Sequence, residues 1–190
     1  MVTSAALYAG FLALLYLERG AELLVSRRNL ALALAAGGVE TGRRHYAVMV
    51  VVHAVFPLAC AAEVLGLHRA FPGAAGFAAL AVALAAQGLR WWAVATLGRR
   101  WSTRIVHVPG AEPVTTGPYR YLRHPNYLAV MLEAAAVPMI HGAWITALVF
   151  VAANAGLLAV RIPAEERALG PGYARAFAAR RRRAAGVPRV

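Results

Sequence analysis

The chain contains no lysine and no aspartate, so all 20 of its cationic side chains are arginine and all 8 of its acidic side chains are glutamate. We attribute this bias to genome composition and draw no functional conclusion from it. Cys60 is the single cysteine, which excludes an intramolecular disulfide. It lies in an apolar run, where we expect a small core residue. No group of histidine, cysteine and glutamate has metal-ligand spacing, so no metal site is predicted.

The N-terminus lacks a basic region before its first apolar stretch and a clear small-residue cleavage site after it. We therefore interpret that stretch as a retained helix rather than a signal peptide. What the chain has in abundance is apolar surface: 61% of its 190 residues are hydrophobic, and its mean hydropathy is +0.58. Soluble domains are roughly 45–50% apolar. The length suits a single domain that comprises residues 1–190.

The net charge of +12 is typical of proteins that bind nucleic acid. In this chain, however, the arginines cluster between apolar spans, where the negative inner leaflet of a membrane would attract them. We therefore predict a membrane protein in contact with lipid that binds no nucleic acid.

Five apolar spans predict an all-α, polytopic integral membrane protein with about five transmembrane helices. The first three spans cover about 4–25, 46–67 and 74–97. A polar loop follows at 98–125. The next apolar stretch, 127–160, is too long for one span, and Pro138 and His141-Gly142 interrupt it. We favour a hairpin of two short spans, with one long tilted helix as the alternative.

The distribution of arginine predicts the orientation. Arginines gather between the first and second spans, between the third and fourth, and after the fifth. Only Arg69 lies between the second and third spans, and none lies between the fourth and fifth. The positive-inside rule therefore places the N-terminus outside the cell membrane and the 98–125 loop in the cytoplasm.

The segment 163–185 is predicted to form an interfacial helix beside the membrane. Pro163 suits its first turn, which places Glu165-Glu166 where the helix dipole favours anions. The Gly-Pro-Gly sequence at 170–172 interrupts this helix. The four arginines at 180–183 would face anionic head groups, or would belong to a disordered basic tail.

The most distinctive polar segment immediately precedes the fourth span. It is dense in aromatic rings and cationic heads, and it reads Gly117-Pro118-Tyr119-Arg120-Tyr121-Leu122-Arg123-His124-Pro125-Asn126-Tyr127. Pro125 suits the first turn of a helix, so His124 would lie beside free backbone N–H groups that can hold an anion. Two interpretations stay open: a cofactor site at the membrane surface, and an interfacial belt of tyrosines.

A second polar group lies where the fifth span leaves the membrane. Arg161 and Glu165 are four residues apart, so they share a face if the segment is helical. Taken alone, this pair indicates a snorkelling arginine with a capping acid.

Together the two segments resemble the isoprenylcysteine carboxyl methyltransferase superfamily of integral membrane methyltransferases. The family pattern is Gly-x-Tyr-x-x-x-Arg-His-Pro-x-Tyr before a membrane helix, then Arg, Glu four and five residues later, Leu and Tyr. The chain matches it at Gly117, Tyr119, Arg123, His124, Pro125, Tyr127, Arg161, Glu165, Glu166, Leu169 and Tyr173. The resemblance covers about 97–177 and leaves the three spans within 1–97 outside it. The chain departs from the family at Ala129, often glycine, and at Glu133, often aromatic.

This resemblance implies that the loop and the ends of the last two spans hold S-adenosylmethionine, while a lipophilic acceptor enters from the bilayer. Arg161 and Glu165 would lie at methyl transfer. The implied cofactor-binding residues are Gly117, Tyr119, Arg123, His124, Pro125, Asn126, Tyr127 and Glu166. A structural role is the alternative for the last of these.

The first third of the chain is similar to a narrower bacterial branch of the family. That branch methylates alkylresorcinols or alkylpyrones, which are phenolic lipids. The similarity is carried by Glu18-Arg19, Glu22-Leu23, Ser26-Arg27-Arg28-Asn29, Gly37-Gly38, Glu40, Gly42, His45-Tyr46 and His53. The implied acceptor is a phenolic lipid, and the carboxylate of a prenylated cysteine is the alternative.

A phenol has an ordinary pKa of about 10, so it must lose a proton to become a strong nucleophile, whereas a carboxylate needs no base. Glu133, in the fourth span, is the candidate base. Charges inside membrane spans cost roughly 2.5–3.5 kcal/mol each, so they are expected to face one another or a wet cavity. Glu133 could therefore instead pair with Arg90 or Arg19.

Two rival functions come from other classes. Membrane reductases that use NADPH share a related C-terminal architecture and a similar Arg-His-x-x-Tyr stretch, but they are longer. A non-enzymatic scaffold or transporter would place polar residues across the bilayer. The polar cluster of this chain lies at one face instead, which favours an enzyme loaded from the membrane surface.

Overall fold

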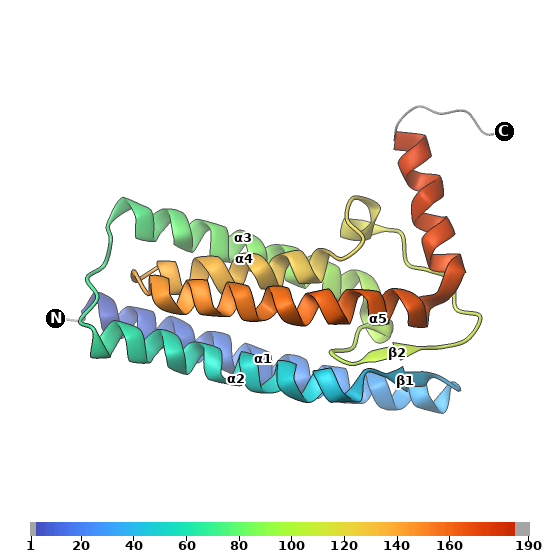
Figure 1. Cartoon of the computed structure of the whole chain (residues 1–190), viewed down its shortest axis with the longest axis horizontal. Coiled ribbons are helices and arrows are strands. Elements are labelled where there is room, and N and C mark those ends of the chain that lie inside the picture. Colours follow the sequence, from blue (N-terminus) through green and yellow to red (C-terminus); the bar gives the residue numbers. More distant parts are fainter. Residues whose placement is uncertain (1–2, 185–190) are drawn as a thin grey trace.

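A computed structural model of the chain describes residues 3–184, apart from the side chains at 44, 174 and 178–184. Within that range five α-helices form one elongated bundle (Figure 1). They are α1 (Ser4–Ala35), α2 (Arg43–Gly66), α3 (Ala74–Leu97), α4 (Pro125–Met139) and α5 (Trp144–Ala184). Contacts between α3 and α4 and between α4 and α5 form one side of the bundle, and α2 packs on both α1 and α5.

The predicted apolar spans correspond to these helices in order. Helix α3 has the predicted bounds, whereas α1 continues to Ala35, well beyond the expected end at residue 25. Three helical segments in the described residues are long and apolar enough to cross a membrane: His45–Gly66, Ala74–Arg100 and Trp144–Tyr173. The chain is therefore a mostly helical membrane protein, and the number of five crossings stays a prediction.

The break between the fourth and fifth helices confirms the predicted hairpin. Helix α4 ends at Met139, and α5 begins at Trp144. Gly142 lies in the connecting turn with φ of 71°, a left-handed conformation that favours glycine. Pro138 belongs to the last turn of α4. One long tilted helix is therefore excluded.

The predicted start of a separate C-terminal helix at Pro163 is wrong. Helix α5 runs through Pro163 without a break, and its single non-helical residue is Gly170, with φ of 74° and ψ of −176°. A proline in a helix removes one backbone hydrogen bond, but packed membrane helices tolerate that loss. The predicted interruption at 170–172 is confirmed: after Gly170 the last part of α5 turns away from the bundle (Figure 1).

A small sheet, which the sequence did not predict, joins two loops at one end of the bundle. Strand β1 (Val39–Thr41) pairs antiparallel with β2 (Ile105–His107), with Glu40 opposite Val106. Two 3-10 turns, η1 (Gly98–Arg100) and η2 (Gly117–Arg120), lie in the same loop as β2. The sheet, the start of α4 and the bend in α5 all lie at this end, which we call the loop end (Figure 1).

A buried apolar core lies toward the opposite end of the bundle. Side chains from α1, α2, α3, α4 and the turn after α4 form it: Tyr8, Leu12, Cys60, Val64, Ala83, Ala136, Val137, Ile140 and Ala143. Cys60 is fully buried, as predicted. Gly76 permits the close approach of α3, since a Cβ there would lie 2.7 Å from the Ile140 carbonyl oxygen. This core fixes one end of the helices and leaves the loop end free to hold a cavity.

Candidate active site

The start of α4 positions the histidine of the distinctive polar segment. His124 is the N-cap residue and Pro125 occupies the first turn, both as predicted. The imidazole of His124 stacks on Tyr127, with ring centroids 5.3 Å apart and an interplanar angle of 19°. Its Nε2 lies 3.1 Å from Oε1 of Glu166 on α5. The first turn of α4 is thereby joined to α5.

Tyr127 links the two polar groups that the sequence singled out. Its hydroxyl donates a hydrogen bond to Oε2 of Glu165 and accepts one from Nε of Arg161 at 2.8 Å. Arg161 and Glu165 share a face of α5, as their spacing predicted. They are not paired directly in the described part of the chain; the phenol oxygen of Tyr127 stands between them.

Arg161 is 5% exposed, and its buried guanidinium is only partly satisfied. Nη2 donates to the main-chain oxygen of Thr103 at 2.5 Å, and Nε donates to Tyr127. Nη1 is buried and has no acceptor among residues 3–184. A buried N–H group without an acceptor is costly, so Nη1 is suited to bind an oxygen of a ligand.

These side chains face a large cavity at the loop end. Its volume is about 780 Å³, and its walls come from all five helices and from the loop that contains β2. Seven of the predicted site residues line it: Tyr119, Arg123, His124, Asn126, Tyr127, Arg161 and Glu165. The amide oxygen of Asn126 is buried without a donor in the described chain. Arg161 and Asn126 both line the cavity, and each has a buried polar atom without a partner in the described chain.

Four of the predicted site residues do not line this cavity. Gly117 packs against α3 with φ of +54°, and a Cβ there would lie 2.3 Å from Oγ1 of Thr96. Pro125 is fully buried in the first turn of α4. Glu166 lies behind His124 and also contacts Arg123 at 3.4 Å. These three residues shape or support the wall of the cavity, and the fourth, Glu133, belongs to a different cluster.

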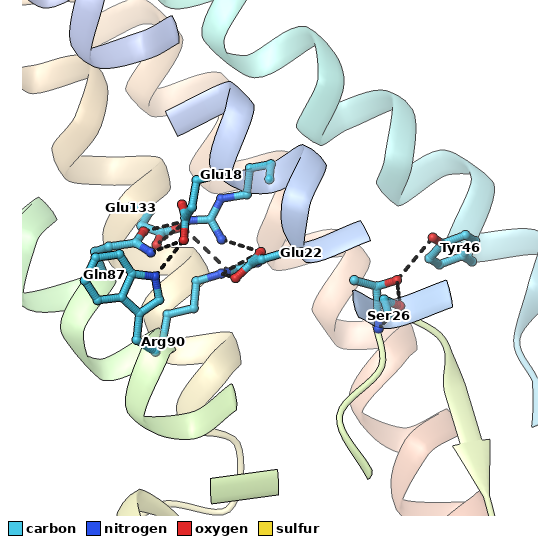
Figure 2. A network of polar contacts seen from close by, with 10 residues as sticks. Glu18, Glu22, Ser26, Tyr46, Gln87, Arg90 and Glu133 are labelled. Carbon is cyan, nitrogen blue, oxygen red and sulfur yellow. Dashed lines mark hydrogen bonds and ion pairs between the residues drawn. The ribbon is translucent and has the colours of Figure 1, made fainter. Parts of the chain in front are cut away.

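Glu133 belongs to a network of charges between α1, α3 and α4 (Figure 2). Its carboxylate lies 3.1 Å from Arg19 and 3.8 Å from Arg90. Arg19 and Arg90 both also contact Glu22, each at 2.7 Å. The expectation that charges inside the spans face one another is therefore confirmed here. These contacts correspond to the ion-pair role that the sequence left open for Glu133.

The same network includes neutral polar groups. The amide of Gln87 accepts from Arg19 at 2.6 Å and donates to Glu18 at 2.5 Å. The indole of Trp91 donates to Glu18 at 2.7 Å. Arg19, Glu22 and Arg90 also border the large cavity. The network therefore forms a polar part of its wall within the helical bundle.

Burial controls the protonation of the tyrosine in η2. Tyr119 is 8% exposed, and its burial raises the pKa of the phenol above its ordinary value, with smaller contributions from Glu165 and Tyr173. The hydroxyl therefore stays protonated at neutral pH. Tyr119 presents a neutral group to the cavity.

No pattern in the sequence indicates that Thr103 contacts Arg161. This residue binds Arg161 through its backbone oxygen, which every amino acid possesses, so no side-chain pattern indicates it. Its hydroxyl contacts Ser26 and Tyr46 at 2.8 Å and 3.2 Å. Ser26 and Tyr46 are both among the N-terminal residues that resemble the bacterial branch. That resemblance was the only signal in the sequence that could have indicated the Thr103 contacts.

Comparison with known proteins agrees with the site. A model of the Isoprenylcysteine carboxyl methyltransferase (ICMT) family matches residues 79–171, which include both polar segments. The uncharacterized protein YpbQ of Bacillus subtilis is 40% identical over 158 residues, which cover 83% of this chain and 94% of YpbQ. An uncharacterized protein of Haemophilus influenzae is 27% identical over 149 residues, 78% of this chain and 86% of that protein. No solved structure matches this chain.

Proposed function

We propose that this chain, which belongs to the isoprenylcysteine carboxyl methyltransferase family, uses S-adenosylmethionine to methylate an oxygen of a lipophilic acceptor. Family membership supports the general activity of a membrane methyltransferase. The observation that carries the finer proposal is the cavity of about 780 Å³ that is lined by Tyr127, Glu165 and Arg161, whose buried Nη1 has no partner in the described chain.

The polar groups of the cavity fit the chemistry of S-adenosylmethionine. That molecule carries a carboxylate, an ammonium group, an adenine ring and a sulfonium cation. The unpaired Asn126 oxygen suits an N–H donor, and the carboxylate of Glu165 suits a cation. The stacked rings of His124 and Tyr127 offer a flat surface for an aromatic base. When bound, S-adenosylmethionine supplies an electrophilic methyl group.

The residues around the cavity provide alignment, charge and exclusion of water. Arg161 can orient and stabilise an anionic acceptor oxygen through Nη1. Glu165 holds the Tyr127 hydroxyl, which in turn fixes Nε of Arg161. Methyl transfer requires the reacting atoms to be aligned at about 3–3.5 Å in a dry site. The fixed guanidinium and the apolar walls meet these two needs.

We further propose that the acceptor is a phenolic lipid, such as an alkylresorcinol or alkylpyrone. The N-terminal similarity to the phenolic-lipid branch supports this choice. The cavity also suits an alkyl chain, because α1, α2 and α5 contribute apolar side chains to its wall: Leu17, Leu23, Met49, Val50, Leu157 and Leu158. A prenylated cysteine would suit the same walls, so the head group decides between the two acceptors.

The acceptor is tested with purified protein, labelled S-adenosylmethionine and a panel of lipids. Label is expected in an alkylresorcinol or alkylpyrone. In direct competition, a preference for a farnesylated cysteine analogue by tenfold or more, which is about 1.4 kcal/mol in the barrier, would overturn the phenolic assignment. It would leave the methyltransferase proposal intact. Transfer to none of the lipids, with NADPH rather than S-adenosylmethionine bound, would favour the reductase.

Glu133 stays a proposed base for a phenol. The alternative is that it serves only as an ion-pair partner, and one variant distinguishes the two roles. If it accepts the phenolic proton, Glu133→Gln should slow methylation near pH 7 and recover at high pH, where phenolate forms unaided. If it serves only Arg19 and Arg90, the variant should lower thermal stability and leave the pH profile of turnover unchanged.

We propose that the protein lies in the cytoplasmic membrane with its N-terminus outside and its loop end in the cytoplasm. The clustering of arginine in segments at the loop end supports this orientation. Reporter fusions after Arg44, Arg69 and Arg104 should read inside, outside and inside. An outside reading at Arg104 would contradict the orientation, and with it access to cytosolic S-adenosylmethionine.

A further inference from the structure

We infer that Thr103, held by Ser26 of α1 and Tyr46 of α2, is a positioning residue that fixes the direction of the Arg161 guanidinium. The inference rests on the proposed function, because Arg161 is the group that would meet the acceptor. It assigns to the first two helices a part in the reaction geometry, although both lie outside the family match at 79–171.

The guanidinium of Arg161 is planar, so two fixed nitrogens determine where the third one points. Tyr127 fixes Nε at 2.8 Å, and the main-chain oxygen of Thr103 fixes Nη2 at 2.5 Å. The remaining nitrogen, Nη1, is the one without an acceptor in the described chain. A displacement of the Thr103 carbonyl would therefore redirect Nη1.

Thr103 lies in a bend just before β2, outside any helix or strand. Regular secondary structure therefore does not hold its carbonyl, and other contacts must do so. Ser26, which is 3% exposed, accepts from the Thr103 backbone N–H at 2.9 Å and contacts its hydroxyl at 2.8 Å. The Tyr46 hydroxyl lies 3.2 Å from the same Thr103 oxygen. Figure 2 shows Ser26 on α1 and Tyr46 on α2 near one another.

The residues on either side of Thr103 are held by the same part of the chain. Asn29 of α1 donates to the Trp101 carbonyl at 2.8 Å, and Glu40 of β1 accepts from Arg104 at 2.7 Å. The anchors of this short loop thus come from α1, β1 and α2, while its carbonyl serves Arg161 on α5. The described contacts form one chain from the N-terminal helices to the guanidinium.

The test compares full-length variants in detergent, with S-adenosylmethionine and an alkylresorcinol as substrates. Ser26→Ala and Thr103→Val should each lower kcat about tenfold, with the KM for the cofactor within about twofold of the wild-type value. Tyr46→Phe should have a smaller effect, because it removes one contact. Thr103→Ser keeps the hydroxyl, so its kcat should stay near the wild-type value, in contrast to that of Thr103→Val.

Matched controls lie on α1 at the far end of the bundle. Ser4 contacts His141 at 3.1 Å, and Tyr8 donates to the Val137 carbonyl at 3.0 Å. Ser4→Ala and Tyr8→Phe therefore remove comparable hydrogen bonds without touching Thr103. They should reproduce any loss of thermal stability and leave kcat per folded molecule unchanged. Equal losses of kcat in the controls and in the loop variants would overturn the inference.

A double-mutant cycle tests the coupling to Arg161. In an Arg161→Lys background, which lacks the planar fork, Thr103→Val should have little further effect on kcat. Additive losses would show that Thr103 acts independently of Arg161, and would contradict the inference.

A readout without turnover separates this inference from the proposed function. The Arg161 Nε–H proton, assigned in an NMR spectrum by its loss in Arg161→Lys, should exchange with solvent faster in Ser26→Ala and Thr103→Val than in the wild type or the controls. Unchanged exchange would overturn the positioning role even in an active enzyme. Faster exchange in a protein that methylates no lipid would support the positioning role and contradict the proposed function.

Discussion

The half-buried Arg19 and the buried Arg90 have partners of a different kind from those of the buried Arg161. Arg19 and Arg90 lie among carboxylates, with Glu22 at 2.7 Å from each. Arg161 has neutral partners instead, a tyrosine hydroxyl and a backbone carbonyl. Nη1 of Arg90 and Nη1 of Arg161 both lack a hydrogen-bond partner in the described residues, but Nη1 of Arg90 lies 3.8 Å from a carboxylate oxygen of Glu133. Removal of one partner from a buried ion pair destabilises the fold. A buried cation that has no carboxylate partner is suited to bind a ligand. The difference distinguishes a network of paired charges from the candidate active site.

The surroundings of the two groups agree with that division. The network joins α1, α3 and α4 to one another within the bundle (Figure 2). Arg161 lies at the loop end, where a bend in α5, the first turn of α4 and the β1–β2 loops meet around the cavity. The network and Arg161 therefore differ in their partners and in their place, although both border one cavity.

The largest expected effect is the loss of turnover in Arg161→Ala. Removal of the unpaired nitrogen should lower kcat at saturating cofactor by about 100- to 1000-fold, as for the loss of one preorganised donor. Cofactor affinity, measured by calorimetry, should change far less. Arg161→Lys keeps the positive charge but lacks the planar guanidinium, so its kcat should lie between that of the wild type and that of Arg161→Ala. Near-normal turnover in Arg161→Ala would restore the interpretation of a snorkelling arginine.

Arg90→Met should affect stability rather than chemistry. It leaves Glu22 and Glu133 without one cation, so the free energy of unfolding should fall by about 3 kcal/mol. Thermal unfolding in detergent measures this change. The double variant Arg90→Met/Glu22→Met should be more stable than Arg90→Met, because both charges of one pair are gone. A loss of turnover larger than tenfold in folded Arg90→Met would place the network within the active site.

Tyr127→Phe tests the bridge between Arg161 and Glu165. The variant keeps the ring that stacks on His124 but removes the hydroxyl that serves both neighbours. We expect kcat to fall about tenfold, or roughly 1.4 kcal/mol in the barrier. Tyr121→Phe is the matched control, since that tyrosine is 73% exposed. Equal rates for the two variants would argue against the bridge.

The smallest expected effect is that of His124→Ala on cofactor binding. Loss of the imidazole removes the stack on Tyr127 and the contact with Glu166. The KM for S-adenosylmethionine should rise several-fold, with kcat within about twofold. Arg120→Ala, which alters an exposed residue of the same segment, should change neither constant. A fall in kcat with unchanged KM would move His124 from cofactor binding to methyl transfer.

The sequence predicted the parts of the fold that depend on local pattern. Long apolar runs identified the helices, and Pro125 identified the start of α4 because its missing N–H is harmless there. The end of α1 was placed too early because the prediction followed apolarity: polar residues at 26–29 end the apolar run, but the leucines and alanines at 30–35 favour helix. The start predicted at Pro163 was wrong because α5 continues through that proline. The β1–β2 pair was missed because strands of three residues leave no periodic signal.

The sequence identified the side chains of the candidate site, but not how they contact one another or the backbone. The resemblance singled out Tyr127, Arg161 and Glu165, and the structure brings the three together. It did not show that Tyr127 stands between the other two, because spacing along a helix reports a shared face but no third partner. Thr103 remained hidden because its contribution to Arg161 comes from the backbone.

Helix α4 has a consequence for the membrane around it. Its 15 residues extend about 22 Å, which is less than the roughly 30 Å of a bilayer's hydrocarbon core. Such a mismatch is relieved by local thinning of the lipid. With such thinning, His124 and Tyr127, at one end of this short helix, would lie at the boundary between head groups and acyl chains. A lipid acceptor would not have to leave the bilayer to be methylated, and the rate should depend on the acyl-chain length of the surrounding lipid.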